Sequence, residues 1–146
     1  MADNATDTTL NGCYRVFISH GHDDRFVAKH IRELLATRGI SSFLDQTDIS
    51  IGDNFRTIIL DELQRCDEVM TLLTPSSLSS AWVFAEIGAA MLAKKKVVAI
   101  RWGLEMEELH RRGVVSLVGD VSLTDLDHVD QYIEAVASRA GGHHND

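Results

Sequence analysis

Short apolar runs alternate along the chain with longer segments in which apolar residues recur every three or four positions. The first pattern is typical of buried strands and the second of amphipathic helices. Strands are predicted at 14–19, 40–44, 68–74, 97–100 and 114–118. Helices are predicted from Phe26 to Leu35 with Gly39 as the stop, and at 54–65, 81–93, 104–110 and 125–138. This alternation predicts right-handed βαβ units around a parallel sheet.

The expected fold is therefore a single α/β domain, doubly wound and three layers deep. The strand at 97–100 is the most hydrophobic and is expected at the centre of the sheet. The domain is expected to cover 13–140, between a flexible N-terminal segment at 1–12 and a flexible tail at 141–146. Ligands of such sheets bind outside the carboxyl ends of the strands. That rule points to three segments expected on one rim, which are the turn His20–Asp23, the loop Asp45–Asp53 and the helix start at Ser79.

Composition narrows the class of protein. Of the 146 residues, 45% are hydrophobic and 25% charged, which is ordinary for one globular domain. The formal net charge of −8 argues against nucleic-acid binding, because phosphate contacts rely on clustered Lys and Arg. No apolar run reaches the roughly 20 residues that span a bilayer and no signal peptide is apparent, so a cytoplasmic protein with no membrane partner is expected. Cys13 and Cys66 lack CxxC spacing and are expected as reduced thiols.

One acidic residue interrupts the apolar helix predicted at 81–93. Glu86 lies in its middle, and Trp82 lies one turn earlier on the same face. Burying a lone carboxylate is costly, so Glu86 must be paired, protonated or placed at the wall of a pocket. An aromatic ring beside such a carboxylate indicates a small-molecule site. A structural ion pair with Arg15 or Arg101 is the alternative.

Several familiar chemistries lack their motifs. The chain has no GxGxxG after its first strand and no GxxxxGK[ST], which excludes the dinucleotide fingerprint and the phosphate loop. Ser19 and Thr74 stand where a phosphorylated receiver domain needs carboxylates. No further ligands support a metal site at His20 and His22, so no metal is expected. Ser19 and His20 do not form a catalytic pair, because adjacent strand residues point to opposite faces.

A series of short motifs follows the predicted elements in order. They are YRVFISH at 14–20 with DD at 23–24, FLD at 43–45, DISIGD at 48–53, TPSSLSSAWV at 74–83, and Glu86. With these motifs in this order and spacing, the chain resembles a Toll/interleukin-1 receptor (TIR) domain over about 14–102. The resemblance implies a flavodoxin-like sandwich with a central five-stranded parallel sheet.

Many bacterial and plant TIR domains cleave NAD, and this chain is similar to them in having a helix glutamate four residues after an aromatic. The resemblance implies a site made of Glu86 as the catalytic residue and of Trp82, Ser19, His20, Gly21 and Asp45 as substrate-binding residues. At the position of His20 the plant pattern has an arginine. The loop Asp45–Asp53 matches the segment that gates the site or docks on a neighbouring subunit.

The same resemblance implies a reaction and partners. NAD is expected as substrate, with no cofactor, and is split into nicotinamide and ADP-ribose or a cyclic ADP-ribose isomer. Self-association through TIR–TIR contacts is expected, and the chain resembles bacterial antiphage components whose product activates a separate effector. Two alternatives stay open: a non-enzymatic adaptor that binds other TIR domains through 45–53, and a nucleoside deoxyribosyltransferase-like enzyme with a nucleophilic glutamate. The pair Trp82 and Glu86 favours an enzyme over an adaptor.

Overall fold

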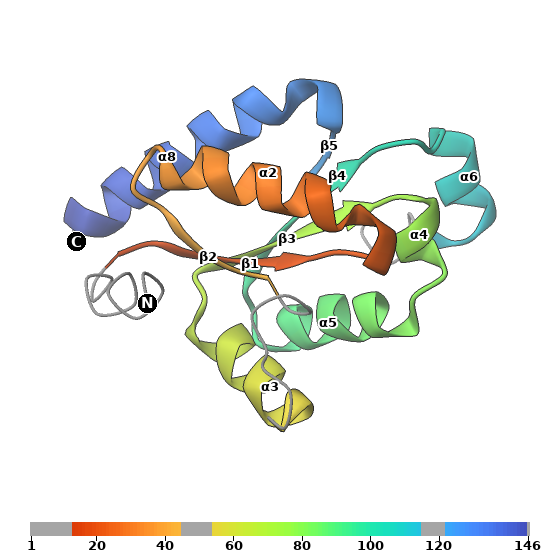
Figure 1. The fold of residues 1–146 in the computed structure, drawn as a ribbon, viewed down its shortest axis with the longest axis horizontal. Coiled ribbons are helices and arrows are strands. Elements are labelled where there is room, and N and C mark those ends of the chain that lie inside the picture. The colour runs from red at the N-terminus through yellow and green to blue at the C-terminus, as the bar shows by residue number, and fades with distance from the viewer. Residues whose placement is uncertain (1–12, 45–53, 115–121, 146) are drawn as a thin grey trace.

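A computed structural model of the protein describes residues 13–44, 54–114 and 122–145. Its strands are β1 (Arg15–Ser19), β2 (Ser41–Leu44), β3 (Glu68–Leu73), β4 (Lys96–Arg101) and β5 (Ser122–Asp125). They form one five-stranded sheet in the order β2-β1-β3-β4-β5, and every pairing is parallel (Figure 1). The doubly wound α/β fold predicted from the sequence is confirmed.

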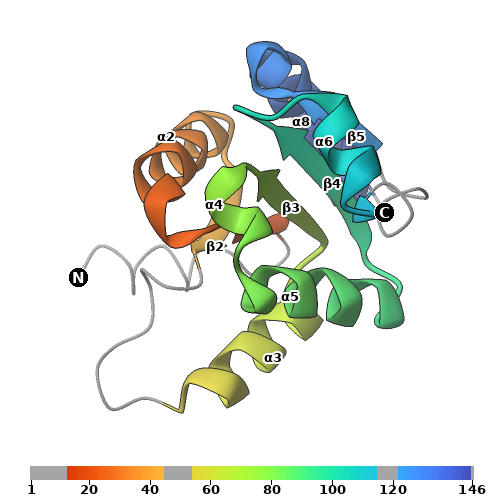
Figure 2. The ribbon, with the colours of Figure 1, turned by 90° about the vertical axis from the view of Figure 1, so that its right-hand side faces the viewer.

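Helices cover both faces of this sheet. They are α2 (Arg25–Ala36), α3 (Phe55–Arg65), α4 (Pro75–Leu78), α5 (Ala81–Leu92), α6 (Met106–Arg111) and α8 (Val129–Asn145), with short 3-10 turns η1 (His22–Asp24) and η2 (Leu126–His128). α2 and α8 lie on one face, and α3 and α5 lie on the other (Figures 1 and 2). Within the described residues, no helix combines the length and apolar character that a membrane crossing requires.

Alternate residues of the strands pack against the two helical layers. Val16 and Ile18 of β1 belong to the apolar cluster shared with α2 and α8. Phe17 belongs to a second cluster, which is shared with α3 and α5. All residues of β3 are buried. Strands covered on both faces are mostly apolar, and the sequence pattern therefore located the inner strands to within one residue.

The sheet corrects the sequence prediction at two strands. The central strand is β3, and the strand predicted as central at 97–100, here β4, lies next to it. The fifth strand is β5, so the prediction of that strand at 114–118 is wrong. Val114 lies in a helical turn and packs beside Leu109, while 115–118 fall outside the described residues. The segment that pairs with β4 at this edge is β5, although its sequence has the lower strand propensity, because pairing and packing outweigh intrinsic preference.

The last helix also differs from the prediction. α8 ends at Asn145 rather than at Ser138, so it includes most of the segment that the sequence assigns to a tail. Buried Val136 and Ala140 continue its packing against the sheet. Glycine lowers helix stability by about 1 kcal/mol relative to alanine, which does not by itself end a docked helix. The flexibility expected of the chain ends stays a prediction.

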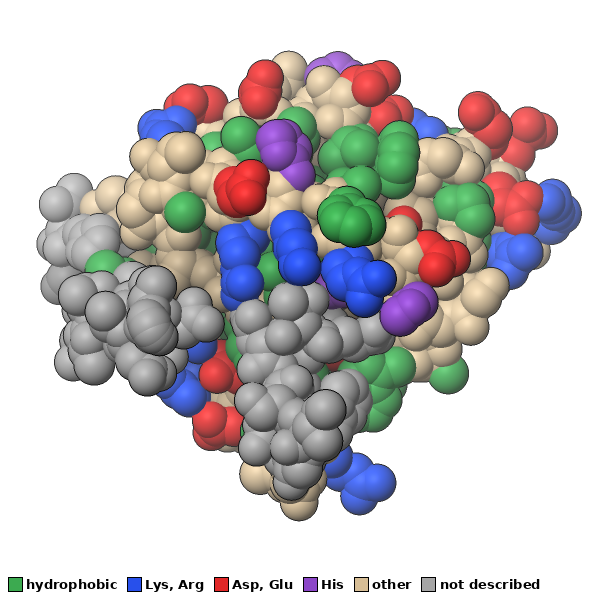
Figure 3. Space-filling view, viewed as in Figure 1, with side chains coloured by type: hydrophobic (Ala, Val, Ile, Leu, Met, Phe, Trp, Pro, Cys, Tyr) green, Lys and Arg blue, Asp and Glu red, His purple; other side chains and the backbone are tan. Residues whose placement is uncertain are grey.

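The outer face of α2 is basic. Arg25 and Lys29 are exposed there, and Lys and Arg side chains gather over this helix in Figure 3. Phe26 is 78% exposed, whereas Ile31 and Leu35 are buried. The helix was predicted to begin at Phe26. This side chain lies outside the buried face of α2. The net charge of −8 is unevenly spread over the surface.

A buried carboxylate joins the last helix to the amino end of the sheet. Glu68, the first residue of β3, has no exposed surface. It accepts hydrogen bonds from the hydroxyls of Tyr14 and Tyr132, each at 2.8 Å. Arg139 of α8 donates to both carboxylate oxygens, from Nε at 2.7 Å and from Nη2 at 3.0 Å. Charge-assisted bonds of this kind offset the cost of burying the carboxylate, so this group fixes α8 to β1 and β3.

We expect this cluster to make the fold sensitive to alkaline pH. Burial and the neighbouring Glu68 carboxylate raise the pKa of Tyr14 and of Tyr132 above the ordinary value near 10. Above about pH 10 the unfolded chain gives up protons that the folded chain keeps, so the stabilisation is complete below that pH and is lost as the pH rises.

The measurement is the free energy of unfolding by urea from about pH 8 to pH 11. A Tyr14→Phe/Tyr132→Phe variant should show a smaller decrease over this range than the wild type, because phenylalanine has no proton to lose. An equal decrease in both proteins would contradict the role assigned to the tyrosines.

Candidate active site

α5 places one carboxylate at the carboxyl edge of the sheet. The helix starts after Ser80, whose hydroxyl accepts a hydrogen bond from the amide of Val83 at 3.3 Å, as expected for an N-cap. Glu86 lies in the second turn and is only 1% exposed. Ser19, the last residue of β1, donates its hydroxyl to Glu86 Oε1 at 2.6 Å. Two of the predicted site residues, 67 positions apart, are thus in direct contact.

The arginines considered as structural partners of Glu86 bind other carboxylates. Arg15 forms an ion pair with Glu62 of α3 at 2.7 Å. Arg101 forms one with Asp125 of β5 at 2.9 Å. The structural alternative for Glu86 therefore loses the two partners that were considered for it.

The turn after β1 packs closely against α4. His20 is 1% exposed, and its Nδ1 lies 2.8 Å from the carbonyl oxygen of Gly21. A Cβ atom on Gly21 would lie 2.5 Å from Ser76 Oγ and 2.8 Å from the amide nitrogen of Ser77. Such distances are far inside van der Waals contact, so only glycine allows this approach. His20 and Gly21 are therefore held rigidly beside Ser19.

Side-chain hydrogen bonds strengthen the contact between the turn after β1 and α4. The hydroxyl of Thr74, directly after β3, donates to the buried Asp24 carboxylate. Thr74 Oγ1 also caps α4 by accepting a hydrogen bond from the amide of Ser77 at 3.1 Å. The amide of Asp23 donates to Ser76 Oγ at 3.3 Å. These bonds join the turn after β1 to the connection after β3.

Two of the three rim segments predicted from the sequence are thus brought together. The turn His20–Asp23 contacts the segment that leads through Ser79 into α5. The third segment, Asp45–Asp53, lies outside the described residues, and with it the predicted substrate contact Asp45. The role of Asp45 stays a prediction.

Gly21→Ala is expected to lower stability by roughly 1–3 kcal/mol, because its methyl group would overlap atoms of α4. Thermal unfolding measures the effect. Gly88→Ala in α5 is the matched control, since a Cβ there meets nothing within 4 Å and alanine favours a helix. The control should therefore melt at the wild-type temperature or above it. Equal melting temperatures for Gly21→Ala and Gly88→Ala would contradict the close packing of Gly21 against α4.

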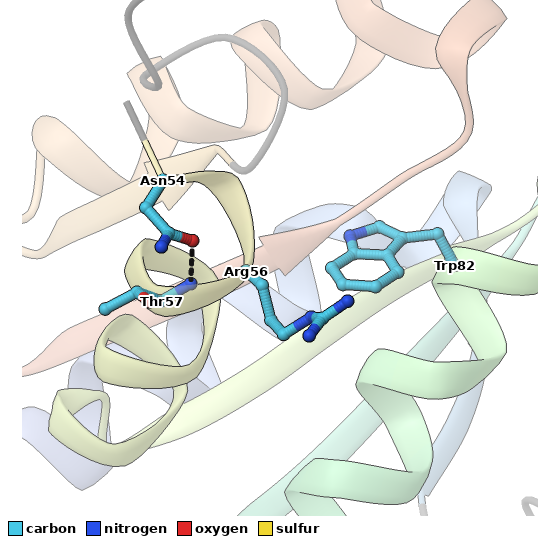
Figure 4. Close-up of a pocket in the computed structure, with 4 residues that line it drawn as sticks. All are labelled: Asn54, Arg56, Thr57 and Trp82. Carbon is cyan, nitrogen blue, oxygen red and sulfur yellow. Dashed lines mark hydrogen bonds between the residues drawn. The ribbon is translucent and has the colours of Figure 1, made fainter. Parts of the chain in front are cut away.

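Trp82 borders a pocket between the starts of α3 and α5 (Figure 4). The pocket has a volume of about 510 Å³, and its described lining is Asn54, Arg56, Thr57 and Trp82. The amide of Thr57 donates to Asn54 Oδ1 at 3.1 Å, which caps α3. Trp82 is half-buried and also packs against the apolar cluster under α3. A volume of this size suits a small organic molecule, so Trp82 stands at the edge of a space that a substrate can fill.

The described residues show no metal-binding cluster and no disulfide. Among residues 13–44, 54–114 and 122–145, no group of three or more His, Cys, Asp or Glu side chains is placed to hold a metal ion. Cys13 and Cys66 form no disulfide, as expected. Burial raises the pKa of the Cys66 thiol to about 11, so it is a poor nucleophile near neutral pH.

Comparison with protein families identifies the family to which this chain belongs. A family model described as TIR domain matches residues 16–136. The chain belongs to the TIR domain family. The resemblance inferred from the motifs is therefore confirmed, and the match extends beyond the motifs to α8.

Curated relatives of this TIR domain carry names of NAD chemistry. It is 29% identical over 101 residues to "NAD(+) hydrolase TcpA" of Theionarchaea archaeon (strain DG-70-1), which covers 66% of this chain and 31% of that protein. It is 26% identical over 98 residues to "Probable 2' cyclic ADP-D-ribose synthase BdTIR" of Brachypodium distachyon, which covers 66% of this chain and 44% of that protein. The chain thus spans less than half the length of these relatives.

Solved structures agree on the fold. The TIR domain of the Toll-related receptor TRR-2 from Hydra magnipapillata superposes with a TM-score of 0.59 at 17% identity, covering 85% of this chain and 91% of that one. At such low identity the similarity extends to the fold alone.

Two residues that lie at the candidate site were not predicted from the sequence. Thr71 of β3 pairs in register with Ser19, so its side chain lies on the same face of the sheet. It is fully buried, and its hydroxyl has no hydrogen-bond partner among the described residues. The only sign of it in the sequence was one polar residue within the apolar run at 69–73. Arg56 gave no signal, because an arginine near the start of an amphipathic helix is ordinary.

Proposed function

We propose that this TIR domain cleaves the bond between nicotinamide and ribose in NAD. The observation that carries the proposal is Glu86, a carboxylate 1% exposed, held by Ser19 and one turn from the indole that borders the pocket. Retaining an acid in such a place costs stability, which favours a catalytic purpose. The names of the two relatives support NAD as the substrate.

The chemistry asks little of the protein. The C1′–N bond breaks with its electron pair moving to the pyridinium nitrogen, so nicotinamide leaves as a neutral molecule and needs no general acid. Positive charge then develops on the ribose as an oxocarbenium ion. Glu86 faces that charge and stabilises it electrostatically, and the Ser19 hydroxyl holds the carboxylate in place. Trp82 lines the nicotinamide side of the pocket.

The product depends on what captures the cation. Water adds its oxygen to C1′ and releases a proton, which gives ADP-ribose. A hydroxyl of the same molecule gives a cyclic ADP-ribose isomer instead. Self-association, and a product that signals to a separate antiphage effector, stay predictions from the sequence.

The test incubates the purified chain with NAD over a range of protein concentrations, with and without a crowding agent. Chromatography and mass spectrometry identify nicotinamide and the product that accompanies it. Release of nicotinamide by the wild type and not by Glu86→Gln supports the proposal. Intact NAD at every concentration, in samples that light scattering finds assembled, would favour the non-enzymatic adaptor.

A further inference from the structure

We propose that Arg56 binds the diphosphate of the dinucleotide substrate, so that the pocket between α3 and α5 selects NAD over the nucleoside that has no phosphate. This inference rests on the proposed function, since it assigns a part of the same substrate to a second part of the site. It concerns a residue that neither the sequence motifs nor the reaction chemistry required.

The charge of Arg56 is not used within the described structure. Arg56 is exposed, and it makes no hydrogen bond or ion pair with any described residue. By contrast, Arg65 at the other end of α3 pairs with Asp61 at 3.1 Å and with Glu62 at 3.6 Å. In a chain of net charge −8, a guanidinium at a pocket that pairs with none of the described carboxylates is a place for an anion.

The position of Arg56 fits the order of groups in NAD. Its side chain extends from α3 toward the indole of Trp82 across the pocket (Figure 4). Glu86 follows Trp82 by one helical turn and lies deeper, at 1% exposed. A substrate with its nicotinamide ribose at Glu86 must continue outward, and the diphosphate is the next group along the molecule. Trp82, one turn from Glu86, lines the same pocket as Arg56, so the diphosphate would lie within reach of the guanidinium.

The guanidinium of Arg56 is chemically suited to a diphosphate. A guanidinium presents paired N–H donors whose spacing matches two phosphate oxygens. Arg56 is also the second residue of α3, an eleven-residue helix, and amides of a first helical turn favour a nearby negative charge. Asn54 Oδ1 already accepts the hydrogen bond of the Thr57 amide, and Arg56 is the only charged side chain among the described residues that line the pocket.

Steady-state kinetics of nicotinamide release test the assignment. Arg56→Ala should raise KM for NAD about 10- to 100-fold and change kcat little. The variant loses a charge-assisted hydrogen bond that stabilises the substrate complex and the transition state equally. Arg56→Lys should recover part of this loss. Nicotinamide riboside, which has no phosphate, should show the same KM with wild type and Arg56→Ala. Arg65→Ala, an exposed arginine on the same helix, should leave all values unchanged.

A KM for NAD that Arg56→Ala leaves unchanged would overturn the inference. A rise of equal size for NAD and for nicotinamide riboside would also overturn it, because that pattern reports general damage to the pocket. In both cases the cleavage of NAD by the wild type would stand, so the proposed function would survive.

Binding of ADP-ribose tests the anion site independently of catalysis. Titration calorimetry should give a dissociation constant about 10- to 100-fold larger for Arg56→Ala than for the wild type and for Arg65→Ala. If the wild type releases no nicotinamide but shows this difference, the anion site stands and the catalytic proposal fails. Equal dissociation constants, or no binding by the wild type, would overturn the anion site.

Discussion

Glu86→Gln is expected to reduce the rate of nicotinamide release by roughly 100- to 1000-fold. Glutamine has nearly the shape of glutamate, and its oxygen can still accept the hydrogen bond of Ser19. It lacks the negative charge that would face the oxocarbenium ion. The loss should therefore appear in kcat, because that charge matters most in the transition state. Single-turnover nicotinamide release at saturating NAD measures it.

The stability of Glu86→Gln shows whether its loss of activity comes from the missing charge or from unfolding. Glutamine keeps the shape of the side chain and the acceptor for Ser19, so Glu86→Gln should melt close to the wild-type temperature. Glu62→Gln is the matched control, since it makes the same change at the carboxylate of α3 that pairs with Arg15. It should keep its activity. Equal rates in Glu86→Gln and Glu62→Gln would remove Glu86 from the mechanism.

Arg139→Ala is expected to cost about 3 kcal/mol of stability, the largest loss we expect from a single substitution distant from the site. The change leaves the carboxylate of Glu68, which has no exposed surface, with only the two tyrosine hydroxyls as hydrogen-bond donors of this cluster. An uncompensated buried charge is what makes such a loss large. For a chain of this size the melting temperature should fall by about 10 °C.

Another arginine supplies the comparison. Arg38 pairs with Glu134 of α8 at 2.5 Å, but the two side chains are 39% and 69% exposed. Exposed pairs contribute about 0–1 kcal/mol, so Arg38→Ala should melt close to the wild type. Denaturant unfolding of the two variants measures the contrast. Similar losses in both would mean that Glu68 is not specially dependent on Arg139.

The fold was predictable where burial imposes a pattern. β1, β3 and β4 are covered on both faces, and their continuous apolar runs identified them. β5 reads Ser-Leu-Thr-Asp and has little apolar pattern, so a neighbouring valine-rich run was chosen in its place. No helix was predicted at α4, where Pro75 follows Thr74. The same dipeptide is also a helix start, with a capping threonine and proline at the first position.

The site was predictable only in part. The helical interval placed Trp82 and Glu86 on one face, and the rule for parallel sheets placed both near the end of β1. The contact between Ser19 and Glu86 depends on how far α5 approaches the sheet, which no local pattern encodes. Arg56 enters the site because α3 and α5 pack side by side. Tertiary neighbours of this kind have no signature in a single sequence.

The sheet order explains how such a site can diversify. β1 and β3 are neighbours in the sheet, although β2 lies between them in the chain. The chain leaves β1 toward α2 on one face and leaves β3 toward α5 on the other (Figures 1 and 2). The two connections therefore part where the strands end, and His20, Trp82 and Glu86 lie on them, whereas Ser19 lies on the paired strand β1. A lineage can exchange these connections and acquire a new substrate or lose catalysis, while the strand pairing it inherited stays intact.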